Sequence, residues 1–128
     1  MSTILIVDDD AAVADVVKLV LSEAGHKCLV AHSPRDALDV VEKQSVDGII
    51  LDVWLGRDDG LDLAATLIER MPTQPFIIMS GGGPGRSLEM VTARADALGA
   101  CSVLYKPFDD DELLTAVDAM LGGTCSET

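Results

Sequence analysis

The sequence predicts a doubly wound α/β fold with five parallel strands in one sheet, in the order 2-1-3-4-5, and five helices on its two faces. Short apolar runs alternate along the 128 residues with segments whose apolar residues recur at helical spacing. The runs are continuously apolar, as is typical of strands buried on both faces of a parallel sheet. Since crossovers between parallel strands are right-handed, few arrangements remain, and this order is the natural one for five strand–helix units.

The first two strand–helix units occupy the N-terminal third of the chain. Residues 4–7 form the first strand, and Gly25 ends the helix that follows it. Residues 28–31 form the second strand. Ser33 and Pro34 are the residue types expected at the cap and first position of the second helix. The apolar positions that define these helices are Val13, Val17, Val20, Leu21 and Ala24, then Ala37, Leu38 and Val41.

The other three units follow the same pattern. Their strands are residues 48–51, 76–79 and 101–105. Pro72 and Gly99 end the third and fourth helices, and Asp109 caps the fifth. The apolar positions of the three helices are Leu61, Ala64, Ala65 and Ile68, then Leu88, Val91, Ala95 and Leu98, then Leu113, Val117, Met120 and Leu121.

The length of the chain is that of a single domain. Gly122 and Gly123 are expected to end the last helix, and few residues follow them. We therefore predict one domain over residues 1–122 and a short flexible tail over residues 123–128.

Composition excludes several classes of function. The net charge is −13, from 22 acidic and 9 basic side chains, so the chain should repel nucleic acid phosphates and not bind DNA directly. No apolar run approaches the roughly 18 residues of a membrane span, and the first residues lack the basic region of a signal peptide. The three cysteines form no CxxC pair, which favours reduced thiols over a disulfide or a zinc site. These observations predict a cytoplasmic protein with no membrane contact.

Polar residues follow four of the five predicted strands. Asp8 and Asp9 follow the first, Asp52 the third, Ser80 the fourth and Lys106 the fifth. The carboxyl ends of parallel strands share one edge of the sheet, and in this flavodoxin-like order the ligand crevice lies there, between strands 1 and 3. Each residue alone is ordinary for a cap, a turn or a surface. Together, at matching strand ends, they predict one functional site.

The chemistry of this cluster favours phosphoryl transfer. Three neighbouring carboxylates need a counter-charge, and a hard divalent cation such as Mg²⁺ prefers oxygen ligands. A carboxylate can attack phosphorus to give an aspartyl phosphate, a reaction that needs positioning and charge neutralisation. Asp52, on the central strand, is the best-placed nucleophile. The Lys106 ammonium and the Ser80 hydroxyl would contact the phosphoryl group, whereas Asp10 is expected only to cap a helix.

The sequence resembles the receiver domains of two-component response regulators over residues 3 to about 121. The motifs that carry the resemblance are Ile4-Leu5-Ile6-Val7-Asp8-Asp9, Leu51-Asp52, Asp59-Gly60, Met79-Ser80-Gly81, Gly99-Ala100 and Lys106-Pro107-Phe108. The resemblance implies that Asp52 is the phosphoacceptor and a ligand of Mg²⁺. It implies further that Asp9 binds the metal directly, Asp8 through water, and Trp54 through its backbone carbonyl.

The resemblance also implies how such a domain works. Ser80 would be the switch hydroxyl and Lys106 the phosphate-binding lysine, joined to Pro107 by a cis peptide bond. A histidine kinase or a histidine phosphotransfer protein would phosphorylate Asp52. The change would alter a face built by the fourth helix, the fifth strand and the fifth helix. That face would contact a downstream protein, a fused output domain or a second copy of the chain. Such a chain is a signalling switch that catalyses only its own phosphorylation and dephosphorylation.

Val103 departs from the family pattern. It stands three residues before Lys106, where the family often has an aromatic switch residue, and Tyr105 shares its face at a different point along the strand. The route of signal propagation is therefore open, and so is a module that binds partners without phosphorylation. A phosphatase with an aspartate nucleophile is a further alternative. Such enzymes commonly have a second aspartate two residues later, where this chain has Trp54.

Overall fold

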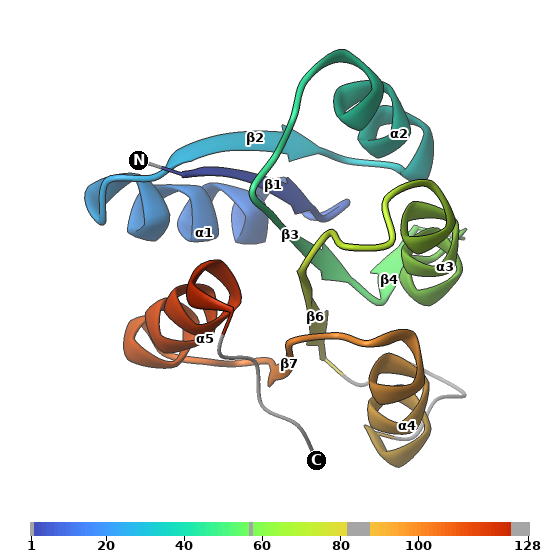
Figure 1. The fold of residues 1–128 in the computed structure, drawn as a ribbon. Coiled ribbons are helices and arrows are strands. Elements are labelled where there is room, and N and C mark those ends of the chain that lie inside the picture. The colour runs from blue at the N-terminus through green and yellow to red at the C-terminus, as the bar shows by residue number, and fades with distance from the viewer. Residues whose placement is uncertain (1, 57, 82–87, 124–128) are drawn as a thin grey trace.

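The structure, a computed structural model, describes residues 2–56, 58–81 and 88–123, which fold as an α/β sandwich (Figure 1). The elements in order are β1 (Thr3–Val7), α1 (Ala11–Glu23), β2 (Lys27–Ala31), α2 (Pro34–Lys43), β3 (Gly48–Asp52), β4 (Trp54–Leu55), β5 (Asp58–Asp59), α3 (Gly60–Arg70), β6 (Phe76–Ser80), α4 (Leu88–Leu98), β7 (Ser102–Tyr105) and α5 (Asp110–Gly122). Five strands form one parallel sheet in the order β2-β1-β3-β6-β7. This is the predicted order 2-1-3-4-5, so the predicted fold class is confirmed.

Helices cover both faces of the sheet, α1 and α5 on one and α2, α3 and α4 on the other (Figure 1). Successive side chains of a strand point to opposite faces, so each central strand contributes to two apolar clusters. Ile50 packs with the α1 and α5 side, whereas Ile49 and Leu51 pack with the α2–α4 side. Burial on both sides explains why the strands are apolar at every position.

The predicted helix caps are confirmed. The Asp10 carboxylate accepts hydrogen bonds from the N–H groups of Ala12 and Val13 at the start of α1. Ser33 and Asp109 cap α2 and α5 in the same way. Because each cap fixes where its helix begins, it also fixes the short loop between that helix and the preceding strand.

The segment between β3 and α3 contains two short strands that the sequence analysis does not predict. Strands β4 and β5 form a small antiparallel hairpin in which Trp54 pairs with Asp59 and Leu55 with Asp58. Strands of two residues are too short to leave a hydrophobic pattern in the sequence. Leu55 is buried and anchors the hairpin to the core of the α2–α4 side.

The expectation for the cysteines needs a correction. Cys28 is free, but Cys101 is disulfide-bonded. Spacing along the chain carried no signal of this, because a disulfide depends on the distance between two residues in the fold. At the C-terminus, Gly123 caps α5 with a positive φ of 71°, whereas residues 124–128 of the predicted tail lie outside the described residues.

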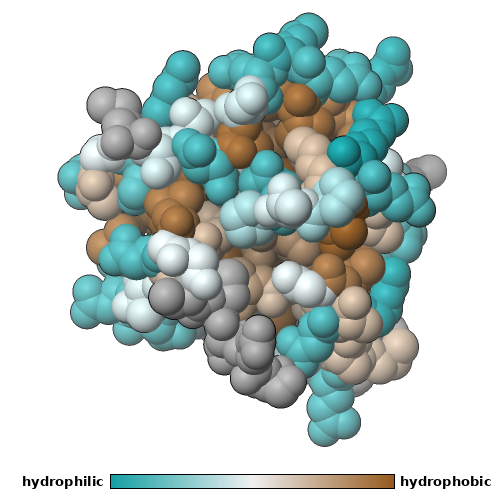
Figure 2. All heavy atoms as spheres, in the orientation of Figure 1, coloured by the Kyte–Doolittle hydropathy of each residue, from teal (hydrophilic) through white to brown (hydrophobic). Residues whose placement is uncertain are grey.

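Figure 2 shows hydrophilic residues over much of one face of the molecule, with smaller hydrophobic areas between them. Among the described residues, no helix has both the length and the apolar character needed to cross a bilayer.

Candidate functional site

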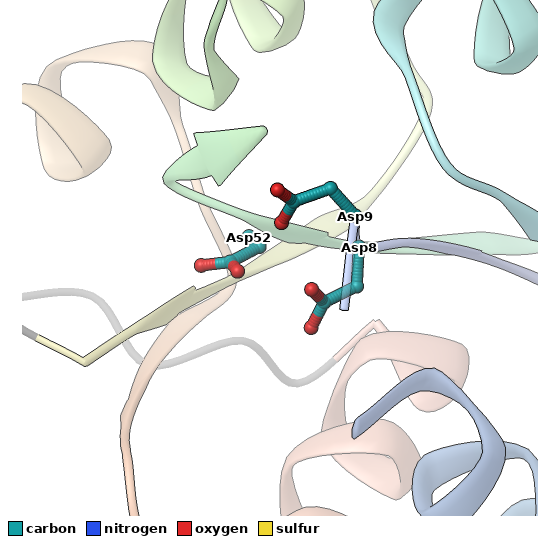
Figure 3. Close-up of side chains that lie close together, drawn as sticks. All are labelled: Asp8, Asp9 and Asp52. Carbon is teal, nitrogen blue, oxygen red and sulfur yellow. The ribbon is translucent and has the colours of Figure 1, made fainter. Parts of the chain in front are cut away.

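Three carboxylates meet at the carboxyl edge of the sheet. Asp8 and Asp9 follow β1, and Asp52 ends β3, which pairs with β1 in parallel register (Figure 3). One carboxylate oxygen from each of the three lies within 4.8 Å of the others. Asp8 and Asp52 are buried, whereas Asp9 is exposed. The predicted convergence of these three residues is therefore present in the structure.

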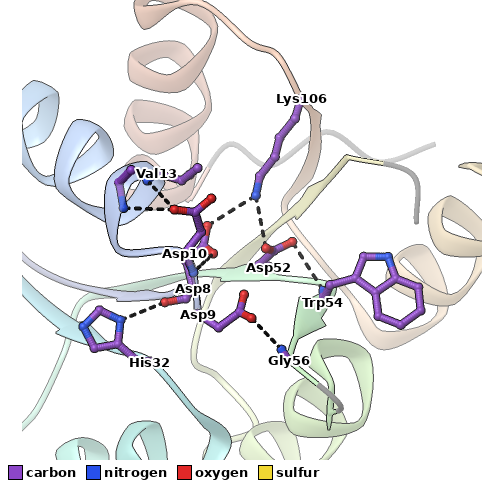
Figure 4. A network of polar contacts seen from close by, with 10 residues as sticks. Asp8, Asp9, Asp10, Val13, His32, Asp52, Trp54, Gly56 and Lys106 are labelled. Atoms are coloured by element: carbon purple, nitrogen blue, oxygen red, sulfur yellow. Dashed lines mark hydrogen bonds and ion pairs between the residues drawn. The ribbon is translucent and has the colours of Figure 1, made fainter. Parts of the chain in front are cut away.

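Lys106 reaches the same cluster from the end of β7. Its ammonium donates hydrogen bonds to Asp52 Oδ2 at 3.1 Å and to Asp8 Oδ2 at 3.3 Å (Figure 4). The Lys106 backbone N–H is held by the carbonyl of Ser80 at 2.8 Å. The Lys106–Pro107 peptide bond is cis, as the resemblance to receiver domains implies.

Ser80 and Trp54 complete the set of predicted site residues. Ser80 is buried at the end of β6, the strand that pairs with β3. The backbone N–H of Trp54 donates to Asp52 Oδ1 at 3.4 Å, and its indole extends away from Asp8 and Asp9 (Figure 4). All six residues thus lie at one edge of the sheet, and their roles stay predictions.

The structure adds contacts that the sequence did not reveal. The backbone N–H of Gly56, in the β4–β5 hairpin, donates to Asp9 Oδ2 at 2.8 Å. Gly56 adopts a positive φ of 64°, which glycine tolerates without strain. His32 Nδ1 lies 3.0 Å from the carbonyl oxygen of Asp8, at the end of the neighbouring strand β2. Because the donor is a main-chain N–H, the sequence does not indicate that Gly56 contacts Asp9; only the geometry of the hairpin shows it.

Gly60 lies against the backbone of the proposed phosphoacceptor. A Cβ atom there would overlap the carbonyl oxygen of Asp52 and stand 2.8 Å from its carbonyl carbon. The Gly60 N–H donates to the carbonyl of Val53 at 2.7 Å. Only glycine permits this close approach, which gives a steric reason for the Asp59-Gly60 motif in the sequence.

Burial and charge oppose each other at Asp52. Burial raises the pKa of its carboxyl from 3.8 to about 6, the Lys106 ammonium works against this rise, and the carboxylate of Asp8 adds to it. For Lys106, burial alone would lower the pKa, but attraction to Asp52 and Asp8 is stronger, so the pKa lies above its usual value. Asp52 therefore keeps its proton up to a higher pH than an exposed aspartate does, mainly because it is buried.

We expect Asp52→Asn to stabilise the metal-free protein. The pKa of Asp52 is higher in the folded chain than in the unfolded chain, so the folded state binds more protons between about pH 4 and 6. Its contribution to the free energy of unfolding is therefore lost as pH rises through this range. At pH 7, in EDTA, the variant should gain about 1–2 kcal/mol, less than the full pKa difference implies because Lys106 loses a partner.

Urea denaturation of both proteins at several pH values measures this difference. The advantage of the variant should shrink as pH falls towards 4. Asp15→Asn, which removes an exposed carboxylate from α1, controls for the general relief of negative charge. If Asp15→Asn raised the free energy of unfolding as much as Asp52→Asn does, the burial of Asp52 beside Asp8 would not be the cause of the gain.

Comparisons with known proteins agree with this geometry. The sequence model of the response regulator receiver domain matches residues 4–118. The transcriptional regulatory protein CpxR of Escherichia coli is 34% identical over 94% of this chain and 50% of its own length. An NtrX-like response regulator of Rickettsia bellii is 33% identical over 87% of this chain and 23% of its own length. The chain thus spans a quarter to a half of these relatives.

Solved structures show the same fold. The receiver domain of NtrX from Brucella abortus superposes with a TM-score of 0.85 at 30% identity, covering 93% of this chain and 98% of that one. A CheY-like receiver domain protein from Methanospirillum hungatei gives a TM-score of 0.87 at 26% identity, covering 97% and 96%. With the family match over most of its length, the chain belongs to the response regulator receiver domains of two-component signalling.

Proposed function

We propose that this domain accepts a phosphoryl group on Asp52 from a histidine kinase or a histidine phosphotransfer protein in the cytoplasm, with Mg²⁺ as cofactor. The observation that carries the proposal is the buried Asp52 carboxylate, with two further carboxylates and the Lys106 ammonium around it. A nucleophile, a set of oxygen ligands and a fixed cation are the parts that phosphoryl transfer to a carboxylate requires.

The donor set fits Mg²⁺. Asp9, Asp52 and the Trp54 carbonyl would hold the ion directly, and Asp8 through water. The cluster offers only oxygen ligands, as a hard cation prefers. Burial raises the pKa of Asp52, and the neighbouring Asp8 carboxylate adds to the rise, so a bound cation would favour the ionised form of Asp52. When bound, Mg²⁺ would neutralise charge on the phosphoryl oxygens.

Each of the proposed site residues has a separate role in the phosphoryl transfer. A carboxylate oxygen of Asp52 forms a bond to phosphorus while the phosphorus–nitrogen bond of the donor phosphohistidine breaks and its imidazole leaves. The Lys106 ammonium, already 3.1 Å from Asp52, offsets charge on the transferred group. The Ser80 hydroxyl donates a hydrogen bond to a phosphoryl oxygen. Attack of water on the same phosphorus later restores the carboxylate.

An apolar groove beside Lys106 supports the choice of a protein donor. It has a volume of about 480 Å³ and lies between α1 and the segment that follows the cis peptide bond. Its lining includes Val13 and Val16 from α1 and Phe108 from the other side, and Val16 is 60% exposed. A donor helix that carries a phosphohistidine would cover these side chains and bring the phosphorus to Asp52.

The face proposed to change is formed by α4, β7 and α5. Met90 on α4 and Tyr105 on β7 are exposed there, and the Tyr105 hydroxyl is hydrogen-bonded to Thr92. The partner that binds this face would be a separate target protein, an output domain in a longer chain or a second copy of the chain. The greater length of the curated relatives supports the second of these.

Intact-mass spectrometry tests the proposal. After incubation with Mg²⁺ and acetyl phosphate, the wild-type chain should gain the mass of one phosphoryl group, and Asp52→Asn should gain none. An adduct that persists in Asp52→Asn would refute Asp52 as the acceptor. No adduct in the wild type, together with no binding of Mg²⁺, would refute the proposal in favour of a module that binds partners without phosphorylation.

A phosphatase is the weaker alternative. Its general acid would stand two residues after the nucleophile, where this chain has Trp54, whose indole N–H is far too weak an acid to protonate a leaving group. Sustained release of phosphate from a phosphate ester would favour it nonetheless.

A further inference from the structure

Arg94 links α4 to the segment that follows the proposed phosphoacceptor. Its guanidinium donates to Asp59 Oδ2 at 3.3 Å and to Asp62 Oδ1 at 3.2 Å, with one nitrogen on each carboxylate. The Asp59 side chain is 14% exposed and that of Asp62 is 76% exposed. The Asp59 contact is therefore the better shielded of the two, and screening by salt weakens it less.

Asp59 occupies a junction in the fold. It ends β5, where it pairs with Trp54 of β4, and its Oδ1 caps α3 by accepting the N–H of Leu61 at 2.7 Å. One carboxylate thus joins the hairpin, the start of α3 and, through Arg94, the helix α4. Movement of the hairpin therefore changes the Arg94 contact.

The opposite side of the hairpin touches the reactive carboxylates. The N–H of Gly56 holds Asp9 Oδ2 at 2.8 Å, and the N–H of Trp54 faces Asp52 Oδ1 at 3.4 Å (Figure 4). The β4–β5 hairpin therefore lies between the acidic site and Arg94. Any change in the positions of the Asp9 or Asp52 carboxylates acts on hydrogen bonds that the hairpin itself donates.

We propose that Arg94 is a positioning residue that couples the acidic site to α4 through the β4–β5 hairpin. The inference rests on the proposed function. Arg94 would provide a route from the site to α4 that Val103 cannot provide. The aliphatic side chain of Val103 packs against the core of the α2–α4 side and can form no hydrogen bond. By linkage, a residue that carries a change from the site to α4 must also affect binding at the site.

The expected change in Mg²⁺ affinity follows from the way Arg94 orders the β4–β5 hairpin. Arg94 holds the hairpin in one position, and the hairpin supplies the Gly56 donor to Asp9 and the proposed Trp54 ligand. Without this restraint, Mg²⁺ would have to bind a less ordered hairpin, so its affinity falls. Because partly exposed ion pairs contribute little free energy, the expected change is a two- to five-fold rise in the Kd for Mg²⁺.

The experiment compares Arg94→Gln with a matched control. Arg70→Gln removes an arginine of similar exposure on α3, whose partner Glu42 at 2.9 Å is remote from the hairpin. The fluorescence of Trp54, the only tryptophan, reports the titration with Mg²⁺. Hydrogen exchange of α4, with and without Mg²⁺ and acetyl phosphate, reports the response of that helix. Asp62→Asn should shift the Kd in the same direction by less.

The two readouts separate coupling from simple loss of stability. We expect Arg94→Gln to raise the Kd two- to five-fold and to reduce the response of α4, while Arg70→Gln leaves both as in the wild type. A Kd and an α4 response in Arg94→Gln equal to those of the wild type would overturn the inference while leaving the proposed function intact. No titration and no mass adduct in the wild type would overturn both.

Discussion

Lys106→Met should slow the phosphorylation of Asp52 by a small donor about 100-fold, the effect of removing one well-placed group that stabilises developing charge. The same variant should bind Mg²⁺ about five-fold more tightly. The Lys106 ammonium lies 3.1 Å from Asp52 and 3.3 Å from Asp8, so it competes with any cation for these carboxylates. Removing one charge at this range is worth about 1 kcal/mol in water.

The variant is expected to lose phosphorylation rate but to gain affinity for Mg²⁺, and few other effects of a substitution would do both. A variant that merely damaged the site would lose affinity for Mg²⁺ and reactivity together. The rate is measured by intact mass against time with acetyl phosphate, and the affinity by Trp54 fluorescence. Lys43→Met, which removes an exposed lysine from α2, should change neither. Weaker Mg²⁺ binding in Lys106→Met would show that the lysine orders the carboxylates more than it competes for them.

Gly60→Ala should destabilise the fold by about 3 kcal/mol or more, although alanine is normally the better residue in a helix. The added methyl group would overlap the carbonyl oxygen of Asp52, which belongs to the main chain of β3 and has little freedom to move. Relief would require β3 and the start of α3 to separate. The displacement would act on Asp52 itself, so phosphorylation should fall with stability.

Gly48→Ala is the matched comparison. A Cβ at Gly48 would overlap the terminal methyl carbon of Met120 and stand 2.8 Å from its sulfur. The neighbour is here the end of a flexible side chain, so this variant should lose about 1 kcal/mol. Urea denaturation ranks the two variants. Equal losses would mean that the backbone around Asp52 yields as readily as a methionine side chain.

Much of this fold could be predicted because its signals are local. Continuous apolar strands, helical spacing and the caps at Asp10, Ser33 and Asp109 each depend on a few neighbouring residues, and the structure confirms them. The convergence of Asp8 and Asp52 followed from topology alone, because adjacent parallel strands end at the same edge.

The parts that could not be predicted depend on main-chain geometry and on long-range contacts. Nothing in the side chain of Gly56 indicates that its N–H holds Asp9, and a hairpin with strands of two residues has no periodicity. The Arg94 contacts join helices about thirty residues apart, and arginine on a helix surface is common. The disulfide at Cys101 was missed for the same reason, since spacing does not encode distance in the fold.

The proposed site residues lie at strand ends, whereas most exposed apolar side chains lie on helices. This separation affects how the sequences of related domains can diverge. The proposed site residues Asp8, Asp52, Ser80 and Lys106 all lie at or next to strand ends, where the sheet fixes them. Of the large apolar side chains that are exposed among the described residues, Val16, Leu19 and Met90 lie on helices and Tyr105 lies on β7. Under the proposed function, substitutions on the helices would redirect the domain to new partners without moving the proposed site residues. A set of paralogues in one cell could share one reaction and still avoid cross-talk.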